Sequence, residues 1–446
     1  MNFSPRFVKL SEVTTLRNGA GIKQENFTDE SNGIPLVKVS NFTQNSIDMS
    51  DLTMVNFDHA QKWKSHVIQR GNVLIATVGS WPPNWSSVVG KVVRAPQNAE
   101  GSIQNQNTCC LIPTEELHEG YLYYKLKDPK FLEWVVNIAQ GSANQARVPV
   151  KKLGEYQFEL PPMEVQKSIA DALESLDLKI SANSHINQTL EQMAQAIFKS
   201  WFVDFDPVKA KMNGEQPEGM DEATASLFPE KLVESEKGLI PEEWKIGQVK
   251  ELCKLVQNGG TPKRKESEYW TNGTINWFTT SELSDSPLIE SKEKISELGL
   301  AKSSVKLWPK GTVLIAIYAA PTVGRLGILS QEAGANQACT GLIPKTNEIG
   351  HYLFNSLYFA RDWLNNISVG AAQQNISKGI VESLEIIIPS DELIESFGRH
   401  VETLWQKRLQ LQKESQSLAN LRDTLLPKLL SGEIELGTSE ELVEAI

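Results

Sequence analysis

The sequence is poor in cysteine and histidine, and neither residue occurs at the spacing of a metal or redox motif. Its four cysteines form no C-x-x-C pair, and no two of the six histidines are spaced as H-x-x-x-H. Neither a zinc site nor a disulfide framework is therefore indicated. Because free cysteine packs as a small hydrophobic residue, we expect the four thiols in the core or in strands: Cys109, Cys110, Cys253 and Cys339.

Long apolar runs are also missing. No stretch approaches the roughly 20 apolar residues that cross a bilayer, and residues 1–10 carry charge but lack the apolar segment of a secretory signal. With 40% hydrophobic and 8% aromatic residues, the 446-residue composition is typical of a soluble globular protein of roughly two to four domains. We expect a cytoplasmic protein without a membrane partner.

Motifs for catalysis are missing as well. There is no G-x-x-x-x-G-K-[ST] loop for ATP phosphates and no Asp/Asn-Pro-Pro-aromatic segment of the kind that holds a target base in amino-methyltransferases. Trp81-Pro-Pro-Asn-Trp85 begins with the wrong residue, which favours a turn or a DNA-facing loop. Asp204-Phe-Asp206 with Lys209 and Lys211 resembles a metal-nuclease site, but its position at a helix end before Pro207 favours capping or a partner contact. We predict a noncatalytic chain with no cofactor or metal of its own.

A net charge of −11 is unfavourable for a DNA-binding protein, because lysine and arginine supply most nonspecific affinity for phosphates. The acidity is unevenly distributed, however. Residues 161–243 hold 7 Lys+Arg against 16 Asp+Glu, and residues 391–446 hold 6 against 11. Residues 1–160 and 244–390 are consequently close to neutral. We place any DNA contact in these two blocks and expect the acidic segments to face protein partners or solvent.

The two near-neutral blocks are related copies. Five pairs of anchors recur in the same order: Asn18-Gly19 with Asn258-Gly259, Arg70–Ala76 with Lys310–Ala316, Asn105-Gln106 with Asn336-Gln337, Gly141 with Gly370, and Pro161 with Pro389. The segment from Ala76 to Asn105 spans 29 residues, against 20 from Ala316 to Asn336. The copies therefore share a frame and differ most in one long loop.

Each block is predicted to be a mixed α+β domain. Short apolar runs between turn residues predict strands at 71–78, 88–94, 109–113, 312–318, 327–330 and 339–344. Helical periodicity predicts helices near 121–140 and 351–367.

A long segment nearly free of glycine and proline follows each block. Steps of four and three residues give one seam through Ile169, Leu173, Leu176, Ile180, Asn183, Asn187, Leu190, Ala194, Ile197 and Trp201, and a second through Phe397, Val401, Leu404, Arg408, Leu411, Ser415, Leu418, Arg422, Leu425 and Leu429. These heptad seams predict two helices paired in an antiparallel coiled coil, in which the polar members fix the register. The alternative is that each amphipathic helix packs only on its own domain, but a helix of this length, about 60 Å at ~1.5 Å per residue, is too long for that.

The resulting fold class is α+β, with two similar mixed α/β domains separated by an antiparallel coiled coil of two long helices; these would be the target-recognition domains of the family that the chain resembles below. The segment between the halves, residues 204–243, is a Pro-, Gly- and Glu-rich connector that is expected to be ordered only in part. It is expected to return the chain along the first helix, so that the domains stand at opposite ends of a paired-helix rod. The predicted segments are domain 1 (1–162), the long central helix (163–203), the connector (204–243), domain 2 (244–390), the long C-terminal helix (391–430) and a tail (431–446).

Segments in both halves resemble the specificity subunits of type I restriction-modification systems. In the first half these are 78–113, Gly141-Ser-Ala-Asn-Gln-Ala-Arg-Val148, Leu160-Pro-Pro-Met-Glu-Val-Gln166 and Ile197-Phe-Lys-Ser-Trp-Phe-Val-Asp-Phe-Asp-Pro207. In the second they are Gly259-Gly-Thr-Pro262, Tyr269-Trp270, Ile275-Asn-Trp277, Thr322-Val-Gly-Arg325, Asn336-Gln337 and Leu421-Arg-Asp-Thr-Leu-Leu-Pro-Lys-Leu-Leu-Ser-Gly432. The first half departs from the pattern at Asn18-Gly-Ala-Gly21, where it lacks Gly-Gly-Thr-Pro.

The resemblance implies a DNA-binding subunit that reads a split site in double-stranded DNA. It implies that each domain reads one half, that the paired helices set the spacing, and that two methyltransferase (M) subunits and restriction/motor (R) subunits join the chain. S-adenosylmethionine, ATP and Mg²⁺ would then belong to those partners, which methylate adenine and cleave foreign DNA in defence of the cell.

Candidate DNA contacts lie in polar loops with amides, arginine and flat aromatics, because such groups reach base edges while lysine and arginine position the phosphates. In domain 1 they are Trp81, Asn84, Trp85, Gln104, Asn105, Gln106, Asn107, Asn144, Gln145 and Arg147; in domain 2 they are Lys263, Arg264, Lys265, Tyr318, Thr322, Arg325, Asn336, Gln337, Gln373, Gln374 and Asn375. Lys263–Lys265 is predicted to clamp a phosphate. For each residue the alternative is a solvated or turn-forming role, and for Asn105-Gln106 and Asn336-Gln337, which recur in both copies, the alternative is a structural role.

Two other classes of function fit the sequence less well. A self-contained DNA methyltransferase or nuclease would show methyl transfer or cleavage by the purified chain alone. A coiled-coil assembly protein with heads that bind protein or sugar would fail to retain DNA, with or without methyltransferase partners.

Overall fold

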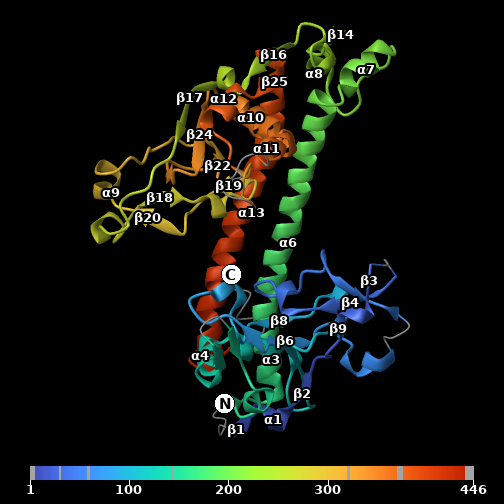
Figure 1. The fold of residues 1–446 in the computed structure, drawn as a ribbon, viewed down its shortest axis with the longest axis vertical. Helices are drawn as coiled ribbons and strands as arrows, with labels where there is room; N and C mark the ends of the chain where they lie inside the picture. The colour runs from blue at the N-terminus through green and yellow to red at the C-terminus, as the bar shows by residue number, and fades with distance from the viewer. Residues whose placement is uncertain are drawn as a thin grey trace. The chain divides into compact units, whose positions relative to one another are not determined.

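A computed structural model describes residues 6–29, 32–57, 61–142, 145–318, 322–368 and 375–436. The chain forms two compact units: unit 1 is Met1–Ile180 with Ser417–Ile446, and unit 2 is Ser181–Gln416. Each unit holds one mixed α+β domain and part of both long helices (Figure 1). We use domain 1 for residues 6–160 and domain 2 for residues 245–388.

Domain 1 is built on a four-stranded antiparallel sheet in the order β2-β10-β6-β8, with bounds Thr14–Asn18, Thr108–Pro113, Val73–Ala76 and Val92–Arg94. A second sheet has the order β3-β5-β4-β9, with bounds Phe27–Thr28, Thr53–Val55, Ile34–Val37 and Ile103–Gln104. A third, β11-β12-β7, comprises Gln140–Ser142, Gln145–Arg147 and Val78–Gly79, and a ribbon joins β1 (Arg6–Lys9) to β13 (Gln157–Leu160).

Domain 2 repeats this plan. Its main sheet has the order β17-β24-β21-β22-β19, with bounds Cys253–Asn258, Cys339–Pro344, Val313–Ala316, Leu326–Leu329 and Ser286–Leu288. A smaller sheet, β20-β18-β23, comprises Glu293–Ile295, Ile275–Phe278 and Gly334–Ala335, and a ribbon joins β16 (Lys245–Gln248) to β25 (Glu385–Ile388). The first four strands of the main sheet follow the same order as their counterparts in domain 1, which confirms the predicted duplication of a mixed α+β frame.

The helices predicted at 121–140 and 351–367 are each split in two. Domain 1 has α3 (Glu119–Lys127) and α4 (Pro129–Ile138), with Asp128 between them. The Asp128 side chain caps α4 by accepting a hydrogen bond from the Lys130 N–H at 3.0 Å. Pro129 stands at the first position of α4, where its missing N–H costs nothing. Domain 2 has α10 (Asn347–Phe359) and α11 (Arg361–Ser368). The short helices are α1 (Leu10–Val13), α5 (Val150–Leu153), α9 (Glu297–Ala301) and α12 (Lys378–Ser383).

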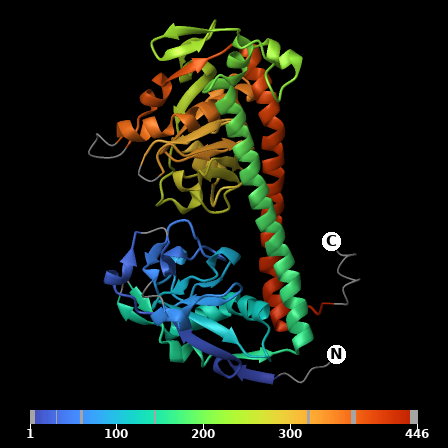
Figure 2. The same ribbon diagram turned by 90° about the vertical axis from the view of Figure 1, so that its right-hand side faces the viewer.

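The two long helices are α6 (Met163–Phe202) and α13 (Asp391–Ser431). Within unit 1 they lie side by side (Figures 1 and 2), and Leu426 and Leu429 of α13 share a core cluster with Ile169 and Leu173 of α6. Arg422 Nη1 lies 2.5 Å from Asp177 Oδ1.

Unit 2 contains the other part of the helix pair. Phe198, Trp201 and Phe202 of α6 pack around Phe397 of α13, with ring centroids 5.2–6.0 Å apart. Further along, Arg408 Nη2 lies 3.0 Å from Glu191 Oε2, and the fully buried Asn183 donates from Nδ2 to Glu414 Oε2 at 2.9 Å. In each unit, contact partners with higher residue numbers on α6 have lower residue numbers on α13. The helices are therefore antiparallel, as the heptads predict.

The segment 204–243 carries more structure than its composition predicts. It contains α7 (Asp206–Met212), α8 (Glu222–Ser226) and a hairpin of β14 (Leu232–Ser235) and β15 (Gly238–Pro241). Phe228 packs edge-on against Trp201 with centroids 5.2 Å apart, and Lys211 donates to the Phe228 carbonyl at 2.6 Å. Aromatic burial therefore orders a segment that its glycines and prolines suggested was flexible.

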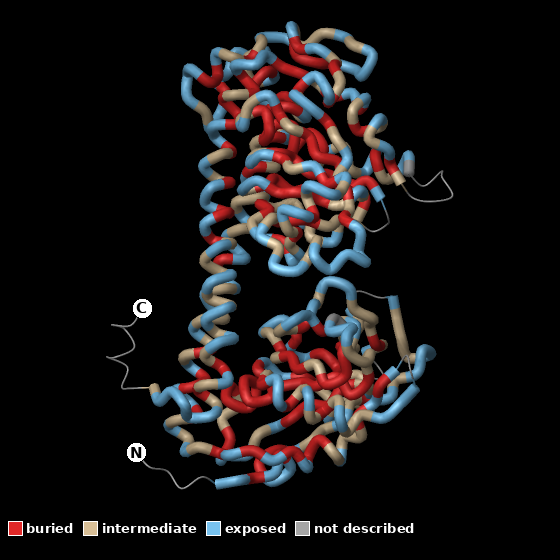
Figure 3. Tube along the Cα trace, turned by 90° about the vertical axis from the view of Figure 1, so that its left-hand side faces the viewer, coloured by how far each residue is buried: buried red, intermediate tan, exposed pale blue. Residues whose placement is uncertain are grey.

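Buried residues gather inside each domain (Figure 3). Cys109, Cys110 and Cys339 are buried and Cys253 is half-buried, all as free thiols, in agreement with the predicted packing role. Burial raises the pKa of the Cys110 thiol to about 11. Among the described helices, none combines the length and the apolarity that a membrane span requires.

Candidate nucleic-acid interface

The strongest match between the domains is an asparagine turn beside an Asn-Gly pair. Asn105 Oδ1 accepts from the Asn107 N–H at 3.0 Å, and Asn336 Oδ1 accepts from the Ala338 N–H at 3.2 Å. A Cβ on Gly19 would lie 1.9 Å from the Asn105 carbonyl oxygen, and one on Gly259 would lie 2.3 Å from that of Asn336. Both glycines are therefore required by close backbone approach, and both asparagines hold the turn.

Hydrogen bonds extend this turn into a matching edge of each domain. In domain 1 the Thr77 N–H donates to the Asn107 carbonyl at 2.9 Å, and the Val148 N–H donates to the Thr77 carbonyl at 2.8 Å. In domain 2 the Ile317 N–H donates to the Ala338 carbonyl at 2.8 Å, and the Ile376 N–H donates to the Ile317 carbonyl at 2.9 Å. We call these the edge of domain 1 (77–85, 105–107 and 145–147) and the edge of domain 2 (317–318, 322–325, 336–338 and 375).

The edge of domain 1 brings together most of the residues predicted there. Trp81 is half-buried and donates from Nε1 to the Ser142 carbonyl at 2.8 Å, which ties its loop to the β11-β12 hairpin. Trp85 is 58% exposed, and Asn84 is also exposed. Gln145 and Arg147 are exposed on β12, where Arg147 pairs with Val78 of β7. Asn144 lies outside the described residues.

Gln104 has a different environment from its neighbours. It is fully buried and donates from Nε2 to the carbonyls of Arg17 at 3.2 Å and Thr108 at 3.0 Å. Its amide thus supports the asparagine turn rather than facing solvent. The neighbouring Gln106 is exposed, and Asn107 is half-buried.

The edge of domain 2 has the same layout with different side chains. Tyr318 is 38% exposed, and the Thr322 hydroxyl donates to its carbonyl at 3.1 Å. Arg325 is half-buried, Gln337 is exposed and accepts a hydrogen bond from the Thr261 hydroxyl, and Asn375 is half-buried. Gln373 and Gln374 lie outside the described residues.

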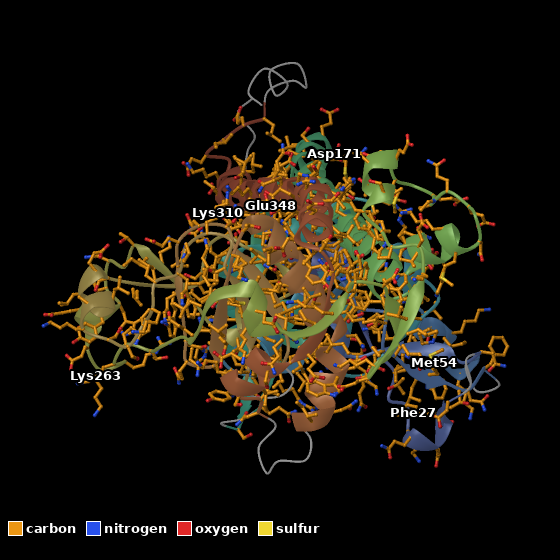
Figure 4. The ribbon with its side chains drawn as sticks, turned by 90° about the horizontal axis from the view of Figure 1, so that it is seen from above. Phe27, Met54, Asp171, Lys263, Lys310 and Glu348 are labelled. Carbon is orange, nitrogen blue, oxygen red and sulfur yellow. The ribbon has the colours of Figure 1, made fainter. Side chains whose placement is uncertain are left out.

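The cationic segment Lys263–Lys265 is not a uniform cluster. Arg264 forms a bidentate ion pair with Glu293, at 2.5 and 2.9 Å, and its guanidinium carbon lies 3.9 Å from the Trp270 ring centroid. The hydrogen bond from Arg264 holds the pKa of Glu293 below its usual range. Lys263 and Lys265 are exposed, and Figure 4 shows the Lys263 side chain directed away from the ribbon. Two lysines rather than three cations are therefore available to a phosphate.

The structure adds a cluster that the sequence gave no reason to connect. Arg361 of α11 pairs with Asp285, 76 residues earlier, and also donates from Nε to the Gly324 carbonyl at 2.8 Å. Gly324 belongs to the turn that carries Thr322 and Arg325. No spacing pattern could have linked these residues, since their proximity depends on the sheet.

Among the described residues, no group of three or more histidine, cysteine, aspartate or glutamate side chains is arranged to hold a metal ion. Asp204 pairs with Lys199 at the end of α6, and Asp206 starts α7 next to Pro207. The residues that resembled a nuclease site therefore lie at helix ends, as expected.

The chain is thus a duplicated protein, with two related α+β domains, matching edges and two long helices. The model of a family described as "Type I restriction modification DNA specificity domain" matches residues 6–192 and 241–406. The chain belongs to this family and is a noncatalytic DNA-specificity subunit.

Individual relatives agree. The chain is 29% identical to the type I restriction enzyme HindI specificity subunit of Haemophilus influenzae, over 70% of this chain and 77% of the relative. It is 26% identical to the MjaIX specificity subunit of Methanocaldococcus jannaschii, over 74% and 73%. The fold is similar to a crystal structure of a type I restriction-modification S subunit from M. genitalium, with a TM-score of 0.53 and 16% identity over 96% of both chains.

Proposed function

We propose that this subunit reads a bipartite site in double-stranded DNA, with one half-site against the edge of each domain, and that it positions methyltransferase and restriction subunits there. The observation that carries the proposal is the equivalence of the two edges. Candidate residues of both domains lie on corresponding turns: Asn105 and Gln106 match Asn336 and Gln337. Two related surfaces in one chain suit a target made of two half-sites.

The side chains at the edges suit base readout supplemented by phosphate contacts. Gln145, Arg147, Gln337 and Arg325 offer donors and acceptors of the kind that read major-groove edges, and Trp85 offers an exposed ring. Lys263 and Lys265 would neutralise phosphates next to the edge of domain 2. Gln104 is left out of the proposed surface because it is buried.

The catalytic chemistry is assigned to partners. S-adenosylmethionine would bind the two methyltransferase subunits, and ATP and Mg²⁺ the restriction subunits, because no phosphate loop or base-holding motif occurs in this sequence. The site of action would be the cytoplasm, where the cell's DNA is methylated.

The test is methylome sequencing of a host that produces the chain with its methyltransferase subunits. A two-part adenine motif with a fixed spacer is expected, and the purified chain alone should neither methylate nor cleave DNA. A continuous motif, or methylation by the chain alone, would contradict the proposal. As a matched variant, insertion of two helical turns at equivalent points of α6 and α13 should lengthen the spacer without changing the bases, since each residue adds ~1.5 Å.

A further inference from the structure

The turn at residues 322–325 directly precedes β22 and carries two candidate contacts, Thr322 and Arg325. The Arg325 N–H donates to the Thr322 carbonyl at 3.0 Å, and the Gly324 N–H donates to the Ala316 carbonyl at 2.9 Å. Behind the turn, Arg361 Nε donates to the Gly324 carbonyl at 2.8 Å. One side chain, that of Arg361, thus binds the carbonyl of the peptide between Gly324 and Arg325.

Arg361 is itself fixed by Asp285. Both terminal nitrogens of its guanidinium bind the carboxylate, with Nη1 3.0 Å from Oδ2. Asp285 also pairs with Leu326, the first residue of β22: its N–H donates to the Leu326 carbonyl at 2.8 Å, and its Oδ1 accepts from the Leu326 N–H at 3.0 Å. These bonds hold Asp285 at φ 58°, a left-handed conformation that few residues other than glycine adopt. The pair is mostly buried, with side chains 22% and 18% exposed.

The other side of Asp285 faces the long helices. Its carbonyl accepts from Arg408 Nη2 at 3.1 Å, and the same nitrogen lies 3.0 Å from Glu191 Oε2. The Arg408 side chain is only 6% exposed. The turn is therefore connected, through Arg361, Asp285 and Arg408, to α13 and α6 within unit 2.

Domain 1 supports the equivalent turn in another way. The Gly90 N–H donates to the Ala76 carbonyl at 2.8 Å, as Gly324 does to Ala316. A Cβ on Gly90 would lie 2.5 Å from Val135 Cγ1 and 3.4 Å from Leu132 Cδ1, whereas one on Gly324 would lie 3.0 Å from Arg361 Cγ. Apolar side chains in domain 1 thus occupy the place of the arginine in domain 2.

We propose that Arg361 and Asp285 are positioning residues that determine base discrimination in the half-site read by domain 2. The inference rests on the proposed function, because it assumes that the turn at 322–325 faces DNA. A bidentate arginine–carboxylate pair fixes orientation as well as distance. Hydrogen bonds from Arg325 and Thr322 to base edges need this fixed geometry, whereas van der Waals support alone tolerates sliding of the turn.

The test uses the chain assembled with its methyltransferase subunits and duplexes that carry the methylated site or single-base changes in either half. Arg361→Leu introduces the residue type that supports the turn in domain 1. We expect the preference for the correct base to fall about tenfold in one half-site and to stay unchanged in the other. Lys378→Leu, which removes a half-buried cation paired with Glu382 in the same domain, is the matched control and should leave both halves unchanged.

A turn variant, Thr322→Val with Arg325→Ala, distinguishes DNA contact by the turn from positioning of the turn by Arg361. If it and Arg361→Leu relax the same half-site, the positioning role is supported. If the turn variant relaxes one half-site and Arg361→Leu does not, the positioning role is wrong while the DNA assignment of the turn stands. If the turn variant leaves both half-sites unchanged, the turn does not read DNA and both ideas fail.

Loss of folding is distinguished from loss of positioning by Arg361→Lys. Lysine keeps the charge against Asp285 but cannot bind both the carboxylate and the Gly324 carbonyl with a planar fork. If Arg361→Leu does not fold, Arg361→Lys is measured in its place. A loss confined to one half-site then supports the proposal, and wild-type discrimination overturns it.

Discussion

The two domains share a backbone frame but fill it with different interactions. Gly141 and Gly370 are 229 residues apart, and so are Trp134 and Trp363. Trp134 packs against Tyr156 and Phe131, with ring centroids 5.2 and 6.2 Å away, whereas Trp363 is 51% exposed. Duplication has thus kept the hydrogen bonds that define the edges while the packing behind them changed. The packing behind the edge of one domain is consequently no guide to the packing behind the other.

The largest predicted difference concerns these two tryptophans. Trp134→Ala should lower the free energy of unfolding by about 3 kcal/mol, because it empties an aromatic cluster, while Trp363→Ala should cost under about 1 kcal/mol. Urea denaturation followed by circular dichroism measures both. Equal losses of unfolding free energy would contradict the prediction, because they would mean that the Trp363 ring contributes as much packing as the Trp134 ring.

The glycines beside the asparagine turns should behave alike in both domains. Gly19→Ala and Gly259→Ala each place a Cβ within 2.3 Å of a backbone oxygen, so each should destabilise the chain by about 2 kcal/mol. Gly379→Ala is the control, since its nearest neighbour, Ser377 Oγ, is 3.7 Å away and alanine favours helix α12. Thermal unfolding compares the three. If Gly19→Ala unfolds at the same temperature as the wild type, the close approach of Gly19 to Asn105 is not required for the stability of domain 1.

Domain 2 carries the cationic loop Lys263–Lys265, and the candidate contacts of domain 1 include no such run of cations. Lys263→Ala with Lys265→Ala should reduce the slope of log K against log salt by about 2, because two phosphate contacts are lost. Adding Arg264→Ala should reduce the slope little further, since Glu293 already neutralises that guanidinium. Binding by the assembled complex at several salt concentrations measures this. An unchanged slope in the double variant would remove the loop from the DNA surface.

The smallest predicted effect involves corresponding glutamates on the two long helices. Glu402 lies 2.5 Å from His351, and Glu174 lies 3.0 Å from Arg94. The hydrogen bond from His351 holds the pKa of Glu402 below its usual range, so its stabilisation is present above about pH 5 and is lost as pH falls through the folded pKa. Glu402 is 43% exposed, and solvent screening keeps the effect under about 1 kcal/mol.

His351→Phe should therefore flatten the acid side of the stability curve, which unfolding at pH 3 to 7 measures. Arg94→Met is the matched variant in domain 1. If His351→Phe leaves the acid limb as steep as in the wild type, Glu402 does not contribute through this bond.

The sequence predicted elements whose pattern repeats over many residues. The heptad seams predicted two long helices, and the structure has α6 and α13, because an apolar stripe of this length fits only one helical register. The recurrence of Asn-Gln left a structural role open as the alternative to DNA contact, and the structure places Asn105 and Asn336 in matching turns. These features depend on local spacing, which is visible in a linear chain.

The features that escaped prediction depend on tertiary neighbours. The burial of Gln104 follows from the carbonyls of Arg17 and Thr108, which the sheet brings to it. The helix break at Asp128 could have been inferred from Pro129, but the order in the connector required knowing that Phe228 meets Trp201. Whether the edge residues read DNA remains a prediction, since the fold positions them without supplying a target.

The discontinuity of unit 1 has a consequence for synthesis. Its core includes Leu426 and Leu429, which are translated more than 250 residues after the rest of domain 1, whereas unit 2 is a single uninterrupted stretch, 181–416. During elongation domain 1 emerges first but lacks the C-terminal part of α13, and unit 2 is complete once residue 416 is made, before that part is added. The half of the protein that is made first is therefore the half that finishes folding last.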